Sequence, residues 1–539
     1  MCSLTALSSL GCQASAGAPD RSKGGGASGG TTAVDPDGNL PDGTPATALL
    51  PARIRRLTNA EYDASVRALT STALTPGRTF APDLRQDGYT LNEAQRVDPL
   101  LAKQLASAAE AIAAEVKQNL DAHAPCADAA AGGEACAQAF IDSFGARAYR
   151  RPLDQAERDA LLAVYQAGAE GAAYADGIEL VVSAVLQSAG FLYLTELGEG
   201  PGPVVTLTPH ELASSLSYLL TEGPPDAELL DVALAGGLAT PEGREQQARR
   251  LLAGARARGV RMVREWLGVD RIEVTAKDSN VYPEFEALRP SMLQETDAFI
   301  NEVVSASTGT VGELLGADWS VVDAPLATMY GATGAGRVSL SGRRGILNQG
   351  AFLSVYAHAT ETAPVLRGVA VARRVICEDI LSPTDLDINV VPPVPDPSKT
   401  TRERFSVHST DNVCAGCHSA IDAFGFAFEH FDGMGKYRDL DSGKPVDSSV
   451  TVAIGADFDG TYADSNELAL ALSQSPRVRT CFARQMFRAS AGTSGPAGRA
   501  SEDAFVEFWA TQPAAEQGSF AETLVAYVKS SLFAQRRLP

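Results

Sequence analysis

Helix-start signals recur along this chain and constrain its fold more than any other feature. Thr58 is followed three residues later by Glu61, the spacing of a capping box, and Asp154 with Glu157 repeats the arrangement. Thr208 is followed directly by proline, which suits the first helical position. After the first and third of these starts, apolar residues recur at helical spacing, whereas strand-like alternation is sparse throughout. We therefore expect a mainly α protein.

A chain of 539 residues is too long for one hydrophobic core, so we expect several modules. A further helix is expected from about Ser291. Composition and helix signals divide the chain into a signal segment at 1–16, a flexible Gly-, Ser- and Pro-rich tether at 17–46, an N-terminal helical module at 47–125, a second helical module at 135–200, a central helical module at 201–335, a C-x-x-C-H module at 340–440, and a C-terminal loop and helical module at 441–539.

The first residues predict export. Residues 1–12 are small and apolar and end in Leu10-Gly11-Cys12, which looks like the end of a bacterial lipoprotein signal whose cysteine becomes lipidated. Two features depart from that pattern, because no Lys or Arg precedes the apolar stretch and the stretch is short. An ordinary cleaved signal is the alternative. Either reading places the body in the periplasm or at the cell surface, with a lipid anchor at Cys12 in the first case.

The charge balance excludes one class of partner. Lys and Arg total 45 against 66 Asp and Glu, which gives a net charge of −21. Electrostatic binding of nucleic acid is therefore not expected. A cationic redox partner would be attracted, although a solvated acidic surface explains the same charge. No later stretch has the eighteen or so uninterrupted apolar residues of a membrane helix, so we expect no transmembrane span in the body.

The chemistry of the chain concentrates at Cys414-Ala415-Gly416-Cys417-His418. Haem c needs two thiols that add to the porphyrin vinyl groups and an imidazole that reaches the iron from the proximal side. Cys414, Cys417 and His418 have this order and spacing. The sequence therefore predicts one covalent haem c, with His418 as the proximal iron ligand.

Three other kinds of site use the same residues. A thioredoxin-like redox pair requires a βαβ setting, which the helical surroundings do not favour. A structural zinc site would need a further ligand, for which His408 or His430 is available, but no second C-x-x-C motif exists. A plain disulfide between Cys414 and Cys417 is the third alternative.

The remaining cysteines predict two disulfides. With Cys2 and Cys12 assigned to the signal, six cysteines remain, an even number that suits an oxidising compartment. If Cys414 and Cys417 hold haem, the natural pairs are Cys126 with Cys136 and Cys377 with Cys481. The first pair closes a short loop rich in Ala and Gly, and the second would link two late modules.

Several short stretches carry a resemblance to a known family. They are Arg55 to Tyr62, Arg147 to Leu153, Leu207 to Ala213, Arg264 to Gly268, Ala363 to Gly368, and Cys414 to Arg438. In this order the chain resembles large secreted proteins of planctomycetes and myxobacteria, which consist of consecutive helical modules of unknown function and end in a cytochrome c-like C-x-x-C-H segment. The resemblance covers nearly everything from about residue 50 onward. It implies export and a cytochrome-like context, and it assigns no reaction.

The sixth iron ligand decides between an electron carrier and a site open to small molecules. His358 occupies the histidine position of the family just before Ala363 to Gly368, so it is the first choice, with a polar core histidine as the alternative. Met434 is the runner-up, sixteen residues after His418. Met486 is more typical of a core residue than of an iron ligand, and His430 is more typical of a hydrogen-bonding residue.

Residues around the motif are expected to support a haem. The apolar side chains from Ile421 to Phe428 would exclude water from one of its faces. For Asp422 and Asp432 we expect turn capping rather than orientation of His418. Four arginines are candidate partners for haem propionates, with surface salt bridges as the alternative: Arg367, Arg402, Arg404 and Arg438.

Two functions from different classes follow from these observations. The first is an exported monohaem c-type cytochrome that acts in electron transfer or as the haem subunit of an oxidoreductase. The second is a cell-surface binding or assembly protein whose C-x-x-C-H motif is a disulfide or zinc staple.

Overall fold

The computed structural model describes residues 34–123, 133–305, 309–380, 396–406, 415–493 and 495–538. The protein is mainly α, as the sequence predicts. Within the described residues, the strands form only two-stranded antiparallel sheets. Cys12, Cys126 and Cys414 lie outside these residues, as do the signal segment and most of the tether.

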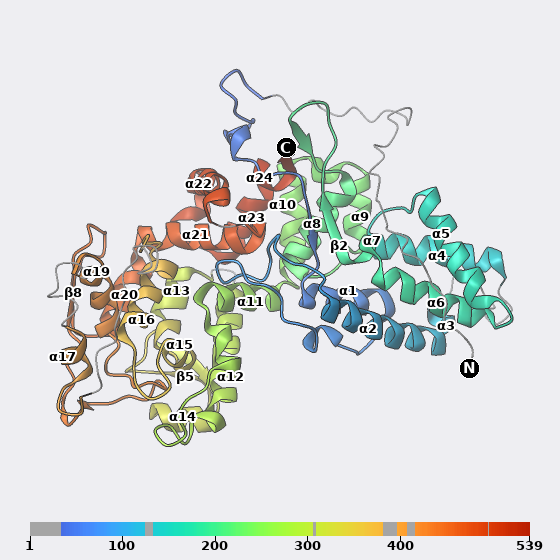
Figure 1. Cartoon of the computed structure of the whole chain (residues 1–539). Coiled ribbons are helices and arrows are strands. Elements are labelled where there is room, and N and C mark those ends of the chain that lie inside the picture. Colours follow the sequence, from blue (N-terminus) through green and yellow to red (C-terminus); the bar gives the residue numbers. More distant parts are fainter. Residues whose placement is uncertain are drawn as a thin grey trace, which may run out of the picture.

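Residues 53–196 form a helical unit with its own core (Figure 1). Its helix α6 packs against α2, α4 and α5. The elements are β1 (Arg53–Arg56), α1 (Asn59–Thr70), α2 (Pro99–Gln118), α3 (Leu120–His123), α4 (Glu134–Tyr149), α5 (Gln155–Ala169), α6 (Tyr174–Gln187), α7 (Ala189–Leu192) and β2 (Tyr193–Glu196).

A second, larger core includes side chains from the central region and the remainder of the chain. Its central elements are β3 (Val204–Thr206), α8 (Pro209–Thr221), α9 (Ala227–Leu234), α10 (Pro241–Leu252), α11 (Arg256–Leu267), α12 (Phe285–Ser305), α13 (Val311–Gly316), β4 (Trp319–Val322), α14 (Ala324–Tyr330) and β5 (Gly336–Ser339). Helix α12 begins six residues before the expected Ser291. Pro290 lies near its start, where the loss of one backbone donor does not end the helix.

The C-terminal part of the chain alternates short helices with hairpins and ends in a helical group that lies against α10. Its elements are α15 (Gly350–Val355), α16 (Pro364–Ala370), the π-helix η7 (Val371–Val375), α17 (Thr401–Phe405), α19 (Ala415–Phe426), β6 (Leu440–Asp441), β7 (Lys444–Pro445), β8 (Val450–Val452), β9 (Gly460–Tyr462), α20 (Ser465–Gln474), α21 (Pro476–Ala491), α22 (Gly495–Ala510), α23 (Phe520–Lys529), α24 (Ser531–Ala534) and β10 (Gln535–Arg537).

A buried ion cluster links distant parts of the chain. The carboxylate of Glu196 on β2 accepts hydrogen bonds from Arg53 on β1 at 2.7 Å and from Arg536 on β10 at 2.5 Å. Burial opposes ionisation of Glu196, but the two guanidinium groups outweigh it and hold the pKa of the carboxyl well below its usual range. Strand β10 also pairs with β3, and Arg537 accepts a hydrogen bond from the amide of Ala52.

Replacing Thr58 with alanine is expected to destabilise the start of α1 by about 1 kcal/mol. The Thr58 hydroxyl accepts a hydrogen bond from the amide of Glu61, and the Glu61 carboxylate accepts one from the amide of Thr58. Hydrogen exchange of the Glu61 amide should accelerate roughly fivefold in the variant, because RT at 25 °C is about 0.6 kcal/mol. Thr480→Ala, at an exposed position inside α21, is the matched control. Unchanged exchange at Glu61 would contradict the assigned cap.

Candidate functional site

Helix α19 carries the end of the C-x-x-C-H motif, and its backbone includes Cys417 and His418. Glycines allow it to lie against α16. A Cβ atom at Gly368 would lie 2.1 Å from the backbone oxygen of Ile421, and one at Gly425 would lie 2.1 Å from that of Pro364. Any larger residue would therefore force the helices apart. The position of Cys414 and the side chain of Cys417 are outside the described residues.

The imidazole of His418 is held by a carboxylate one helical turn away. Nδ1 of His418 lies 2.9 Å from Oδ1 of Asp422, and the side chains are 17% and 8% exposed. The expected turn-capping role of Asp422 is therefore wrong, because the residue lies inside α19 and faces His418. Asp432 does cap a turn, since its carboxylate accepts the amides of Met434 and Lys436.

This arrangement suits a metal-ligating histidine. Such histidines usually donate one ring N–H to a carboxylate or carbonyl, which fixes the tautomer and orients the ring. Because Asp422 takes Nδ1, the nitrogen that an iron would take is Nε2. Since His418 and Asp422 are four residues apart, the helical repeat brings their side chains to one face. That spacing was the available sequence signal for the pair.

His418 lines a cavity of about 580 Å³ between α19, α17 and the hairpin of β8 and β9. The guanidinium of Arg402 lies 4.7 Å from the ring centre of Phe426, and both side chains line the cavity. Arg402 also donates hydrogen bonds to the carbonyls of Asp447 and Ser449. The cavity thus offers an imidazole, a cation suited to a carboxylate, and an aromatic wall. These are groups that a haem with propionates requires, so the residues present fit it.

Most of the apolar residues expected to wall this site are instead part of the core. Phe424 and Phe428 are 0% and 1% exposed and belong to the large core. Ala423 and Phe426 are the apolar members of the Ile421 to Phe428 stretch that line the cavity.

Neither candidate sixth ligand lines this cavity. His358 is exposed in the segment after α15, where its carbonyl accepts a hydrogen bond from Nζ of Lys277. Met434 is 1% exposed and packs in an apolar cluster with Phe285 and Met292. Met486 is a core residue, and the ring of His430 stacks on Tyr437, with its Nδ1 3.0 Å from the carbonyl of Arg438.

Of the four arginines proposed as propionate partners, Arg402 alone lines the cavity. Arg404 pairs with Glu361 and Arg438 pairs with Glu429. Arg367 is 0% exposed, and burial lowers the pKa of its guanidinium to about 10. Its guanidinium donates hydrogen bonds to the backbone carbonyls of Leu353, Phe428, Phe431 and Asp432.

The cysteine pairs lie outside the cavity. A disulfide joins Cys377, just beyond η7, to Cys481 on α21, with the two Cα atoms 5.4 Å apart. Cys136 is also in a disulfide, and its expected partner, Cys126, lies beyond the described residues. Within the described parts of the chain, no group of three or more His, Cys, Asp or Glu side chains is placed to hold a metal ion. No helix there is long and apolar enough to span a membrane.

Four family models match successive parts of the chain. Residues 55–118 match PSD3, a protein of unknown function (DUF1587), and residues 136–196 match PSD5, also of unknown function (DUF1595). Residues 207–332 match PSD4 (DUF1592), and residues 343–441 match PSCyt3 (DUF1588), both likewise described as proteins of unknown function.

No curated protein and no solved structure matches the chain. The four matches follow one another without overlap, and the last includes His418 and Asp422. The chain therefore carries, in consecutive order, the four domains of unknown function that make up the planctomycete-type multi-module arrangement, with the cytochrome-named PSCyt3 domain around the C-x-x-C-H motif.

Proposed function

We propose that this protein is an exported monohaem c-type cytochrome that transfers electrons, alone or as the haem-bearing subunit of an oxidoreductase. The observation that carries the proposal is the contact between His418 and Asp422 beside a cavity, directly after a C-x-x-C-H motif. The name of the PSCyt3 domain supports it. Export, an anchor at Cys12 and a cationic redox partner belong to the same proposal.

Each residue of the site has a defined role in this proposal. Cys414 and Cys417 would hold the porphyrin through thioether bonds, and Nε2 of His418 would bind the iron. Asp422 orients the ring of His418, and Arg402 would pair with a propionate. Bound haem c would supply a one-electron redox centre. The sixth iron ligand is left unassigned, because His358 and Met434 do not line the cavity.

Covalent haem staining tests the proposal directly. The protein should be produced in a bacterial host that matures c-type cytochromes, and it should then show a haem-stained band and a Soret absorbance. The double variant Cys414→Ala, Cys417→Ala should lose both signals. Cys136→Ala removes a disulfide cysteine outside the motif and should retain them. Zinc without iron in the purified protein, or no bound metal at all, would instead favour the structural-staple function.

Replacing Asp422 with asparagine is expected to raise the midpoint potential of the haem by about 60 mV. A carboxylate on Nδ1 makes the imidazole more basic and so favours ferric over ferrous iron. Loss of such a partner commonly changes metal affinity tenfold or more. A tenfold change in the ferric-to-ferrous preference corresponds to about 59 mV for one electron.

Spectroelectrochemical titration measures this potential. Asp432→Asn is the matched control, because Asp432 caps a turn and retains capping ability as asparagine. An unchanged potential in Asp422→Asn, with haem still attached, would show that Asp422 does not act on the iron ligand.

A further inference from the structure

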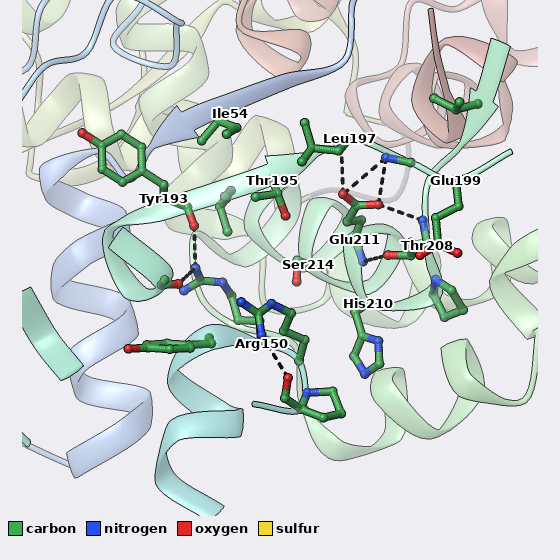
Figure 2. A pocket seen from close by; sticks show the side chains of 18 of the residues that line it. Ile54, Arg150, Tyr193, Thr195, Leu197, Glu199, Thr208, His210, Glu211 and Ser214 are labelled. Atoms are coloured by element: carbon green, nitrogen blue, oxygen red, sulfur yellow. Dashed lines mark hydrogen bonds between the residues drawn. The ribbon is translucent and has the colours of Figure 1, made fainter. Parts of the chain in front are cut away.

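A second, larger pocket lies beside β2 and the start of α8 (Figure 2), elements that lie well away from α19 in Figure 1. Its volume is about 1430 Å³. It is lined by the end of α4, by β1 and β2, and by the start of α8. Two of the four matched family regions, residues 136–196 and 207–332, therefore contribute side chains to this pocket.

Two side chains with several hydrogen bonds each build the walls of the pocket (Figure 2). The guanidinium of Arg150 donates to the carbonyls of Ala148, Gly190, Phe191 and Tyr193, and so fastens α4 to α7 and β2. The carboxylate of Glu211 accepts from the amides of Leu197, Gly198 and Thr208, and so fastens the end of β2 to α8. The shape of the pocket is thus fixed by the protein.

Strand β2 presents one open backbone position to this pocket. Strands β1 and β2 are antiparallel, with Ile54 opposite Thr195, and the amide of Leu57 donates to the carbonyl of Leu192. Hydrogen-bonded and non-hydrogen-bonded pairs alternate along such a ladder. The amide and carbonyl of Thr195 therefore point away from β1. At the neighbouring outward positions, Arg150 donates a hydrogen bond to the carbonyl of Tyr193, and the amide of Leu197 donates one to Glu211.

A hydroxyl also faces the pocket. Ser214 on α8 lines the pocket, and no hydrogen-bond partner for its hydroxyl is present among the described residues. This hydroxyl is therefore available to a bound molecule.

The rest of the lining combines aliphatic surface with charged groups, among which the carboxylate of Glu199 has no ion-pair partner among the described residues. Four large aliphatic side chains line the pocket although 39–60% of each is exposed: Ile54, Leu197, Leu234 and Leu538. Arg151 is neutralised by Glu157, with which it makes two hydrogen bonds. Burial, together with Arg151, lowers the pKa of His210, so this ring is neutral at pH 7.

We propose that this pocket binds an extended, non-acidic peptide segment whose backbone pairs with Thr195 and whose apolar side chain lies among the exposed aliphatic residues. Addition of a strand to an open sheet edge uses backbone hydrogen bonds for affinity and side-chain pockets for specificity. An amide, a carbonyl and a hydroxyl without partners among the described residues, together with an aliphatic surface, match the groups of a peptide. The carboxylate of Glu199 disfavours an acidic segment. The proposal does not depend on haem.

Panning a random dodecapeptide phage library tests it. The full chain is immobilised through its N-terminal end, because Leu538 lines the pocket. An enriched peptide is then labelled with fluorescein, and its binding is measured by fluorescence anisotropy. Peptides with apolar residues should be enriched. Ile54→Glu should raise the Kd at least tenfold, whereas Leu440→Glu should change it less than twofold. Leu440 is the matched control, since it also lies on a strand and is 56% exposed, against 54% for Ile54.

Thr195→Pro tests the backbone contact separately. Proline removes the outward amide but no bond to β1, and it is tolerated on edge strands whose amide faces solvent. Thr195→Pro should therefore also weaken binding at least tenfold, whereas Thr195→Val, which retains the amide, should not. Melting temperatures show whether the variants fold. If Thr195→Pro does not fold, the Kd of Ile54→Glu alone decides whether the proposal stands.

Two kinds of result would overturn the proposal. The first is that no peptide is enriched above the uncoated support, or that Ile54→Glu leaves binding unchanged. The second is that a dansyl-labelled undecanoic acid binds in an Ile54-dependent way while no peptide does, which would identify the pocket as an acyl-chain site.

Discussion

Replacing Arg367 with leucine is expected to lower the free energy of unfolding by about 3–5 kcal/mol. The side chain is fully buried, and its guanidinium donates to four backbone carbonyls in two segments that precede and follow α19. Leucine fills part of the volume but satisfies none of these acceptors, and each unsatisfied buried acceptor costs about 1–3 kcal/mol. The substitution also removes one of the two guanidinium groups near Glu429, at 3.9 Å, and leaves Arg438 at 2.8 Å. Burial already raises the pKa of the Glu429 carboxyl.

Urea unfolding followed by far-ultraviolet circular dichroism measures this loss. Arg499→Leu is the matched control, because Arg499 makes a surface ion pair with Asp379 and such pairs contribute at most about 1 kcal/mol. If Arg367→Leu unfolds at the same urea concentration as Arg499→Leu, the network around Arg367 does not hold this part of the fold together.

Stability should also fall as the pH rises from about 4.5 to about 7, because of Glu295. This carboxyl on α12 is 1% exposed, and burial raises its pKa to about 7. It accepts hydrogen bonds from Ser320 and Tyr330, both at 2.7 Å. Since the folded state binds this proton more tightly than the unfolded state, the stabilisation is complete below pH 4.5 and is lost as the pH passes the folded pKa. The difference amounts to about 3 kcal/mol.

Glu295→Gln should remove this dependence, because glutamine has a similar shape and no charge to desolvate. The variant should be more stable than the natural chain at pH 8 by about 3 kcal/mol and similar to it at pH 4.5. Glu302→Gln is the control, since Glu302 lies on the same helix and makes a surface pair with Arg337. Parallel stability curves for Glu295→Gln and Glu302→Gln between pH 4.5 and 8 would refute the assignment.

Local signals in the sequence predicted the helix starts well. Thr58, Asp154 and Thr208 are each the N-cap of a helix, and each forms a capping box with the glutamate three residues later. Such signals succeed because the cap and its partner lie within one turn. The helix expected from about Ser291 begins six residues earlier, at Phe285, and continues through Pro290.

The site was predictable only in part, because the sequence signals for it are local as well. The spacing of the C-x-x-C-H motif singles out His418, and the helical repeat places Asp422 beside it. The position of His358 depends on how a distant loop packs, and a sequence motif carries no such information. Arg367 could not be recognised as a structural residue, because its acceptors are backbone carbonyls, which every residue possesses.

The cluster of Arg53, Glu196 and Arg536 also constrains the order in which the chain can fold during its synthesis. Glu196 and Arg536 are separated by 340 positions along the chain. During translation Glu196 is therefore made long before one of its two counterions, and the larger core lacks the strand at residues 535–537 until these residues have left the ribosome. The helical unit up to β2 has its own core and can form first. The second core therefore closes late, after the residues of β10 have been made.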